Sequence, residues 1–330
     1  MSKYISKIYL SNIDPKHLIK NYTICKNEKK IILKKFQDSL KRKDIENSEK
    51  YALELHCSGY FDIIYKKMIN IYFDNINIAQ PQGLNIIYEF AEYYNKKYTF
   101  KIKKEHPIYI VNDQTVRNII FYMISLIATS NERKILKLKK IDLEDFNLSN
   151  KKGKLITNNL NLVKNFLTSG DPKEIIVPVS EICNYFKKKP ENAHLKIIYW
   201  ISWIFDYDKQ YHKNNLQIGV REMPGVDTKY YRDFVWLIWR IIFKFTNELN
   251  EKYIKILYKL YILGYSKGTK RSRSNLIIFA VMMIINPIPR IEYPVKPLNE
   301  TQFKKIYLNC LKCNILYKNF FQKNEFKKLS

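Results

Sequence analysis

Residues 36–84 decide the fold and read FQDSLKRKDIENSEKYALELHCSGYFDIIYKKMINIYFDNINIAQPQGL. Their apolar side chains recur mostly at steps of three and four, which is the period of an amphipathic helix, on both sides of Ser58 and Gly59. Pro81 cannot continue a helix, so we expect the second helix to end near Asp74. The stretch therefore predicts a helical hairpin. Its periodic positions are Ile45, Tyr51, Leu53 and Leu55, then Ile63, Ile64, Met68, Ile71 and Tyr72.

Helical periodicity continues on both sides of this hairpin. Residues 27–43 place apolar side chains on one face and lysines around the remainder, and residues 85–94 and 116–129 predict two further helices. The second of these is apolar nearly all round, as a buried helix is. The composition then turns polar and charged over residues 134–158, where we predict a domain boundary.

The second half repeats this logic. We predict a helix at 161–168 and, after a break at 169–172, a second helix that ends at 186. Further helices are predicted at 193–205, 230–249, 252–263 and 276–285, separated by glycine, proline and lysine breaks. The expected fold is all-α, a multi-helical array of helical hairpins. The expected division is a helical domain at 1–145, a second helical domain at 146–300 that is a candidate divergent repeat of the first, and a basic C-terminal helix or tail at 301–330.

The charge balance points to a polyanionic partner. The 330 residues hold 58 Lys and Arg against 31 Asp and Glu, a formal net charge of +27. Abundant lysine, isoleucine and asparagine is typical of an AT-rich genome, such as that of a large DNA virus, but such a genome does not deplete acidic residues. Nucleic acid is therefore the favoured partner class, over a basic surface that serves solubility alone.

Cysteine usage and hydropathy indicate the compartment. Five scattered cysteines and the absence of a secretory pattern at the first residues predict an intracellular, reducing location, which is the cytoplasm, the nucleus, a viral factory or a virion. The longest uncharged apolar run, residues 276–285, is shorter than the ~20 residues of a membrane span. We expect no membrane partner.

One resemblance rests on residues 42–84 and 123–131. Arg42-Lys43-Asp44, Tyr51-Ala52-Leu53-Glu54-Leu55, Lys66-Lys67-Met68 and residues 74–84 (DNINIAQPQGL) are followed by residues 123–131 (MISLIATSN). These segments resemble the helical C-terminal region of the MgsA/RarA group of clamp-loader-related AAA+ ATPases, which includes the Werner-helicase-interacting ATPases. The resemblance implies a clamp-loader-like fold, self-association, a separate ATPase or other replication proteins as partners, and work in DNA replication, repair or recombination. The ATPase module of that family is absent, and its Glu-Asp-Ile-Gly core is altered at residues 74–77.

Motifs for catalysis and for cofactors are missing. Residues 264–270 have neither the spacing nor the preceding strand of a phosphate-binding P-loop, so we expect no ATP hydrolysis by this chain. Cys310 and Cys313 have metal-ligand spacing but no second pair beside them, and the five histidines are isolated. We predict no enzyme activity, no metal and no cofactor.

The sharpest candidate site is a basic loop, residues 264–275, that precedes the apolar helix 276–285. Its cations lie in an expected flexible segment before a helix N-terminus, where side chains, backbone N–H groups and the helix dipole can meet one phosphate. A solvated lysine-rich loop is the alternative reading. The candidate nucleic-acid-binding residues are Lys267, Lys270, Arg271 and Arg273, with Lys34, Lys35, Lys41, Arg42, Arg133 and Lys137 as a secondary set.

These features predict a non-catalytic protein that binds single- or double-stranded DNA without sequence preference. An accessory factor in replication, repair or recombination is the first interpretation. A structural DNA-packaging or virion component is the alternative, in which the same charge neutralises DNA in bulk.

Overall fold

The computed structural model describes residues 21–23, 25–98, 108–111, 113–132, 136–147, 163–211 and 218–286. Regular structure within these ranges is helical, apart from an isolated bridge between Tyr22 and Glu28. This confirms the prediction of an all-α, multi-helical protein. The chain divides into two compact units, the first reaching Glu132 and the second spanning Arg133–Arg290.

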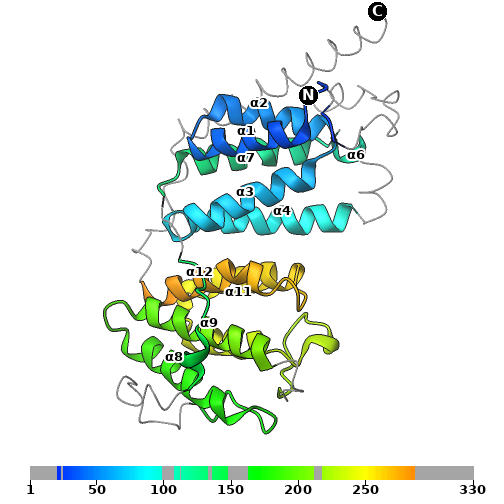
Figure 1. The fold of residues 1–330 in the computed structure, drawn as a ribbon. Coiled ribbons are helices and arrows are strands. Elements are labelled where there is room, and N and C mark those ends of the chain that lie inside the picture. Colours follow the sequence, from blue (N-terminus) through cyan, green and yellow to red (C-terminus); the bar gives the residue numbers. More distant parts are fainter. Residues whose placement is uncertain are drawn as a thin grey trace, which may run out of the picture. The chain divides into compact units, whose positions relative to one another are not determined.

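The first unit is built around one buried helix. It contains α1 (Lys29–Lys41), α2 (Ile45–Cys57), α3 (Phe61–Asn75), α4 (Gly83–Lys97), the short α6 (Ile108–Val111) and α7 (Gln114–Thr129), with a 3-10 turn at Asn77–Ala79. α7 packs against α1, α2, α3 and α4, and Figure 1 shows it beside α1 and α2, with α3 beside α4. Because α7 is apolar on most sides, it can fill the space between them.

The predicted hairpin is confirmed as α2 and α3. Asp44 caps α2 by accepting a hydrogen bond from the backbone N–H of Asn47. Gly59, between the two helices, has a φ of 78°, a conformation that glycine adopts without a Cβ clash. The break therefore follows from the sequence.

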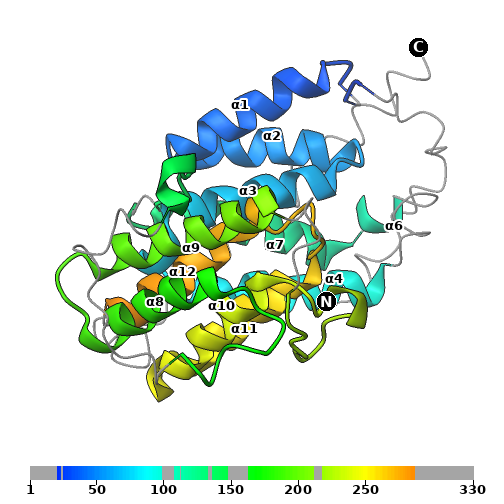
Figure 2. The same ribbon diagram turned by 60° about the horizontal axis from the view of Figure 1, so that its bottom comes forward.

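The second unit packs around α12. It contains α8 (Ile176–Lys188), α9 (Ala193–Tyr211), α10 (Phe234–Phe245), α11 (Glu248–Leu263) and α12 (Ser274–Ile285), with 3-10 turns at Leu143–Phe146, Lys173–Ile175, Thr228–Tyr230 and Arg271–Arg273. α12 contacts α9, α10 and α11, and Figure 2 shows α8 to α12 grouped together. Trp203, Trp236 and Trp239 are fully buried in this unit.

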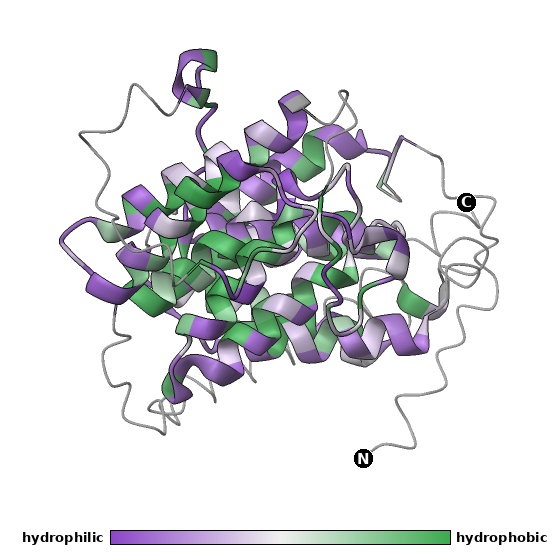
Figure 3. Cartoon of the chain, turned by 90° about the horizontal axis from the view of Figure 1, so that it is seen from below, coloured by the Kyte–Doolittle hydropathy of each residue, from purple (hydrophilic) through white to green (hydrophobic). Residues whose placement is uncertain are grey.

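Both units bury their apolar faces in the ordinary way. In Figure 3 most helices carry hydrophobic and hydrophilic residues along the same ribbon, as amphipathic helices do. α12 differs, because all its residues from Leu276 to Ile284 are buried. It is therefore the core helix that its composition predicts.

Three sequence predictions differ from the structure. The predicted helix at 161–168 is instead a turn at residues 163–166, followed by irregular backbone at 167 and 168. The predicted helix 230–249 is instead a 3-10 turn, α10 and the start of α11, because Asn247 accepts a hydrogen bond from the N–H of Asn250 and caps a new helix.

The domain boundary falls at Glu132, ahead of the predicted one at residue 145. The reason is that Leu143–Phe146 packs on α9: Trp203 donates its indole N–H to the Asp145 carbonyl over 2.9 Å, and its ring meets Phe146 edge to face. The predicted tail at 301–330 lies outside the described residues.

Candidate nucleic-acid interface

The basic loop between α11 and α12 is an ordered turn. Ser266 and Thr269 bond each other reciprocally: the Ser266 N–H donates to the Thr269 hydroxyl over 2.9 Å, and the Thr269 N–H donates to the Ser266 hydroxyl over 3.3 Å. This pairing has the form of a capping box and fixes the turn before Arg271–Arg273. These residues therefore form an ordered turn and not the flexible loop that the sequence predicts.

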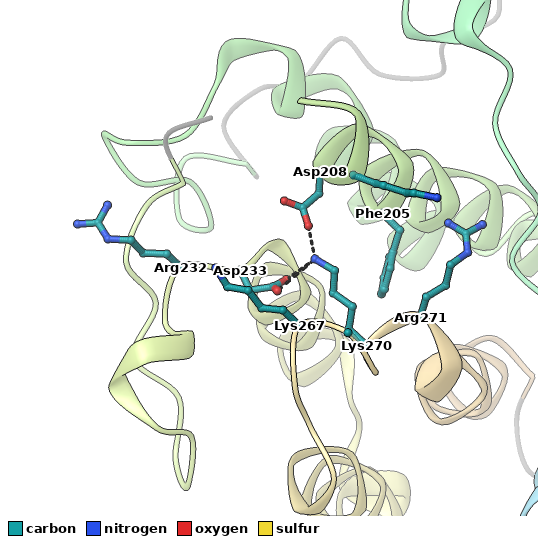
Figure 4. Close-up of a pocket in the computed structure, with 9 residues that line it drawn as sticks. Phe205, Asp208, Arg232, Asp233, Lys267, Lys270 and Arg271 are labelled. Atoms are coloured by element: carbon teal, nitrogen blue, oxygen red, sulfur yellow. Dashed lines mark hydrogen bonds and ion pairs between the residues drawn. The ribbon is translucent and has the colours of Figure 1, made fainter. Parts of the chain in front are cut away.

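Lys270 points inward and joins two carboxylates. Its ammonium forms ion pairs with Asp208 from α9 and with Asp233, the N-cap of α10, the latter at 3.1 Å. Figure 4 shows the ammonium between the two acids, with Phe205 beside it. The side chain is 15% exposed and its partners 7% and 2%. Burial alone would lower the pKa of Lys270, but Asp233 and Asp208 outweigh it and raise that pKa.

Asp233 is held from several sides at once. Its carboxylate accepts hydrogen bonds from the Val235 N–H at 2.9 Å and from the Tyr265 hydroxyl at 2.6 Å. Burial, and then the neighbouring Asp233 charge, raise the pKa of Tyr265, so its hydroxyl stays protonated and donates. The Lys270 cluster, defined as Lys270, Asp208, Asp233 and Tyr265, thus joins α9, α10 and the end of α11.

The two arginines of the loop are also engaged within the unit. Arg271 forms an ion pair with Asp206 on α9 and donates to the Lys139 carbonyl over 3.2 Å. Arg273 donates to the carbonyls of Leu260 and Tyr261, the latter over 3.1 Å, and so satisfies acceptors at the C-terminal end of α11. Of the four predicted cations, only Lys267 is exposed and forms no side-chain ion pair or hydrogen bond with the described part of the chain.

The secondary set on α1 presents the opposite picture. Lys34, Lys35, Lys41 and Arg42 are all exposed, and none forms an ion pair with a described residue. Lys30 on the same helix shares these properties but was missing from the sequence-based set. Asp38 is the one acidic residue of α1, against five lysines.

Helix geometry aligns these lysines. At about 100° per residue, Lys30, Lys34 and Lys41 fall within roughly 40° of one another, on the side opposite Ile32, Phe36 and Leu40. Those three apolar residues are buried against the unit, at 3%, 0% and 1% exposure. The lysine stripe, defined as Lys30, Lys34 and Lys41, therefore faces away from the helix's own core and extends about 17 Å along the axis. Lys35 and the C-cap residue Arg42 form a second row about 100° farther around the helix, on the other side of Asp38.

The last two predicted nucleic-acid-binding residues are Arg133 and Lys137. Lys137 is exposed in the second unit, and Arg133 lies outside the described residues, as do Cys310 and Cys313. In the described ranges no group of three or more His, Cys, Asp and Glu side chains could hold a metal ion. No helix there is long and apolar enough to cross a bilayer.

The carboxylates of the Lys270 cluster were missed by sequence reasoning. Asp233 carries a local signal, since it directly precedes the apolar run of α10 and an Asp in that position is an N-cap. Its partner Lys270 is 37 residues away, and Asp208 is 62 residues from Lys270. No local pattern links residues at such separations.

Comparison of the chain with protein-family models, with curated proteins and with solved structures gives no match. The resemblance of residues 42–84 and 123–131 to the MgsA/RarA group therefore stays a prediction.

Proposed function

We propose that this protein binds nucleic acid through backbone phosphates, at the lysine stripe on α1 and at the second row, Lys35 and Arg42. The observation that carries the proposal is that all five cations are exposed, without an ion-pair partner in the described residues, on a helix whose other face is buried. Lysines without carboxylate partners release counterions from DNA when they meet its phosphates, and this release drives association.

The spacing of the stripe suits a nucleic-acid backbone. Phosphates recur about every 3.4 Å of helix axis on each DNA strand, so a stripe of about 17 Å spans roughly five base-pair steps. Lysine ammonium groups on flexible stems contact phosphates as point charges and carry no information on base identity. Binding is therefore sequence-tolerant.

The biological role follows from the resemblance. We place the protein as an accessory factor, without catalysis of its own, in DNA replication, repair or recombination, alongside a separate ATPase or other replication proteins and with self-association. The support for this part is the resemblance of residues 42–84 and 123–131 to the MgsA/RarA group. A DNA-packaging or virion component is the second candidate, favoured by the net charge of +27 over the whole chain.

The test compares two matched triple variants by fluorescence anisotropy on a labelled oligonucleotide. Lys30→Gln/Lys34→Gln/Lys41→Gln removes the stripe, while Lys50→Gln/Lys66→Gln/Lys96→Gln removes the same charge from exposed positions on α2, α3 and α4. We expect the first variant to bind at least about ten-fold more weakly than the second at the same salt concentration.

Equal loss in both variants would contradict the proposal, because net charge and not the stripe would then set affinity. The same assay separates the two roles. Preference for single-stranded over duplex DNA supports the accessory role, whereas equal affinity for DNA and heparin supports bulk packaging.

A further inference from the structure

A cavity of about 430 Å³ lies in the second unit, beside the Lys270 cluster. Its walls come from the C-terminal part of α9, the start of α10 and the basic loop, so three segments far apart in sequence build it. The volume lies in the range of small-molecule sites, roughly 300–1,000 Å³. A single phosphate ion would fill only a small part of it.

Cations dominate the lining. Lys209, Arg232, Lys267, Lys270 and Arg271 line the cavity, together with Asp208 and Asp233, and Asp206 stands behind Arg271. Five cations against three carboxylates leave an excess of two positive charges. Lys270 is committed to Asp208 and Asp233, and Arg271 to Asp206.

Two lysines are available to a ligand. Lys209 on α9 and Lys267 on the basic loop are exposed, and neither has an ion-pair partner in the described residues. Arg232 donates to the Ile218 carbonyl over 3.3 Å, and in Figure 4 its guanidinium is directed away from Lys270. The available positive charge at this cavity therefore comes from Lys209 and Lys267.

The cavity also offers an apolar wall and open space. The Phe205 ring lines it, with the Lys270 ammonium 5.9 Å from the ring centroid. Gly268 also lines the cavity, and a Cβ placed there would meet no atom within 4 Å. A ligand can thus combine an anionic group at the two lysines with a flat organic group toward Phe205.

We propose that this cavity binds a phosphate monoester on a planar organic group, of which a mononucleotide is the simplest member, with Lys209 and Lys267 contacting the phosphate. The free nucleotide and the phosphorylated 5′ end of a nucleic-acid strand share this chemistry. The site lies within the second unit and is separate from the lysine stripe on α1, so either can fail without the other.

The experiment is isothermal titration calorimetry of the full chain with AMP, with adenosine and inorganic phosphate as partial ligands. The test variant is Lys209→Gln/Lys267→Gln, and the matched control is Lys244→Gln/Lys252→Gln, which removes two exposed lysines from α10 and α11 of the same unit. Circular dichroism checks that both variants are folded.

We expect AMP to bind the parent and the control alike, and the test variant at least about ten-fold more weakly. Adenosine and inorganic phosphate should each bind more weakly than AMP. Absence of AMP binding at millimolar concentration, unchanged affinity in the test variant, or equal affinity for AMP and either partial ligand would each overturn the proposal.

Competition then identifies the source of the phosphate. Displacement of AMP by a 5′-phosphorylated trinucleotide, and not by its 5′-hydroxyl form, assigns the site to strand ends; failure of both assigns it to free nucleotides. The Lys30→Gln/Lys34→Gln/Lys41→Gln variant should bind AMP as the parent does, which separates this result from the test of α1.

Discussion

At the scale of single residues, Lys270 shows why composition alone misjudged the basic loop. A lysine in a lysine-rich segment is usually solvated, yet this one is 85% removed from solvent between Asp208 and Asp233. Removing one partner of a buried ion pair leaves an uncompensated buried charge, which costs more than the pair itself contributes. Loss of the Lys270 ammonium would leave the buried carboxylates of Asp208 and Asp233 without their cation.

Lys270→Met should therefore lower the free energy of unfolding by about 3–5 kcal/mol. Lys267→Met, three residues earlier in the same loop, serves as the control and should change it by less than ~0.5 kcal/mol because Lys267 is exposed. Urea denaturation followed by circular dichroism measures both. Similar small changes in the two variants would show that the ion pairs are absent in solution.

His56 gives a second residue-scale prediction, for pH. Its ring is 1% exposed, and its Nε2 donates to the Val111 carbonyl over 3.1 Å. Burial, and then the nearby Arg117 charge, lower the His56 pKa to about 3. The unfolded chain thus takes up a proton below about pH 6.5 that the folded chain refuses, so stability rises with pH between about 3 and 6.5.

From pH 7 to pH 5 this one residue should cost the parent about 2 kcal/mol of unfolding free energy. His56→Gln keeps a donor near Val111 and cannot titrate, so its loss over the same interval should be smaller by that amount. Denaturation curves at the two pH values give the difference. An identical pH dependence in parent and variant would mean that His56 is accessible to protons in the folded state.

At the scale of elements, the helix boundaries show what local sequence can and cannot supply. The α2–α3 hairpin was predictable because its period, its N-cap Asp44 and Gly59 all agree. The break between α10 and α11 was missed because apolar and aromatic residues continue through it, although Asn247 carries an N-cap signal. The segment 161–168 has too few residues for periodicity to separate a helix from the turn found at 163–166.

The N-cap role of Asn247 can be tested by substitution. Its side chain accepts a hydrogen bond of 3.0 Å from the Asn250 N–H, so Asn247→Ala should lower the free energy of unfolding by about 1 kcal/mol. Asn247→Asp keeps an acceptor at the N-cap and should retain most of the stability. Thermal unfolding compares the three proteins. Equal destabilisation by alanine and aspartate would mean that the cap is not formed.

The candidate site residues also divide into those that local sequence could predict and those that it could not. The exposed positions of α1 could be read from its period, since Lys34, Lys35 and Lys41 fall away from the apolar face. The internal contacts of Lys270, Arg271 and Arg273 could not be predicted from the sequence. Their partners Asp206 and Asp208 are distant in the chain, and the α11 carbonyls belong to the backbone. Sequence identifies which charges exist, and packing decides which of them remain available.

At the scale of the whole molecule, a net charge of +27 is divided between internal and available cations. Lys270, Arg271, Arg273 and Arg221 are used inside the second unit. The four exposed lysines of α1 and its C-cap residue Arg42 are not, and we propose that they bind nucleic acid. Affinity alone tests this weakly, because any loss of positive charge reduces attraction to DNA.

The salt dependence of binding tests the claim most directly. Each lysine–phosphate contact contributes about 0.9 to the slope of log K against log salt for duplex DNA. Lys30→Gln/Lys34→Gln/Lys41→Gln should flatten the slope by about 2.7 relative to the parent, while Lys50→Gln/Lys66→Gln/Lys96→Gln leaves it unchanged. A parent-like slope in the stripe variant, or equal flattening in both variants, would contradict the assignment of DNA binding to α1.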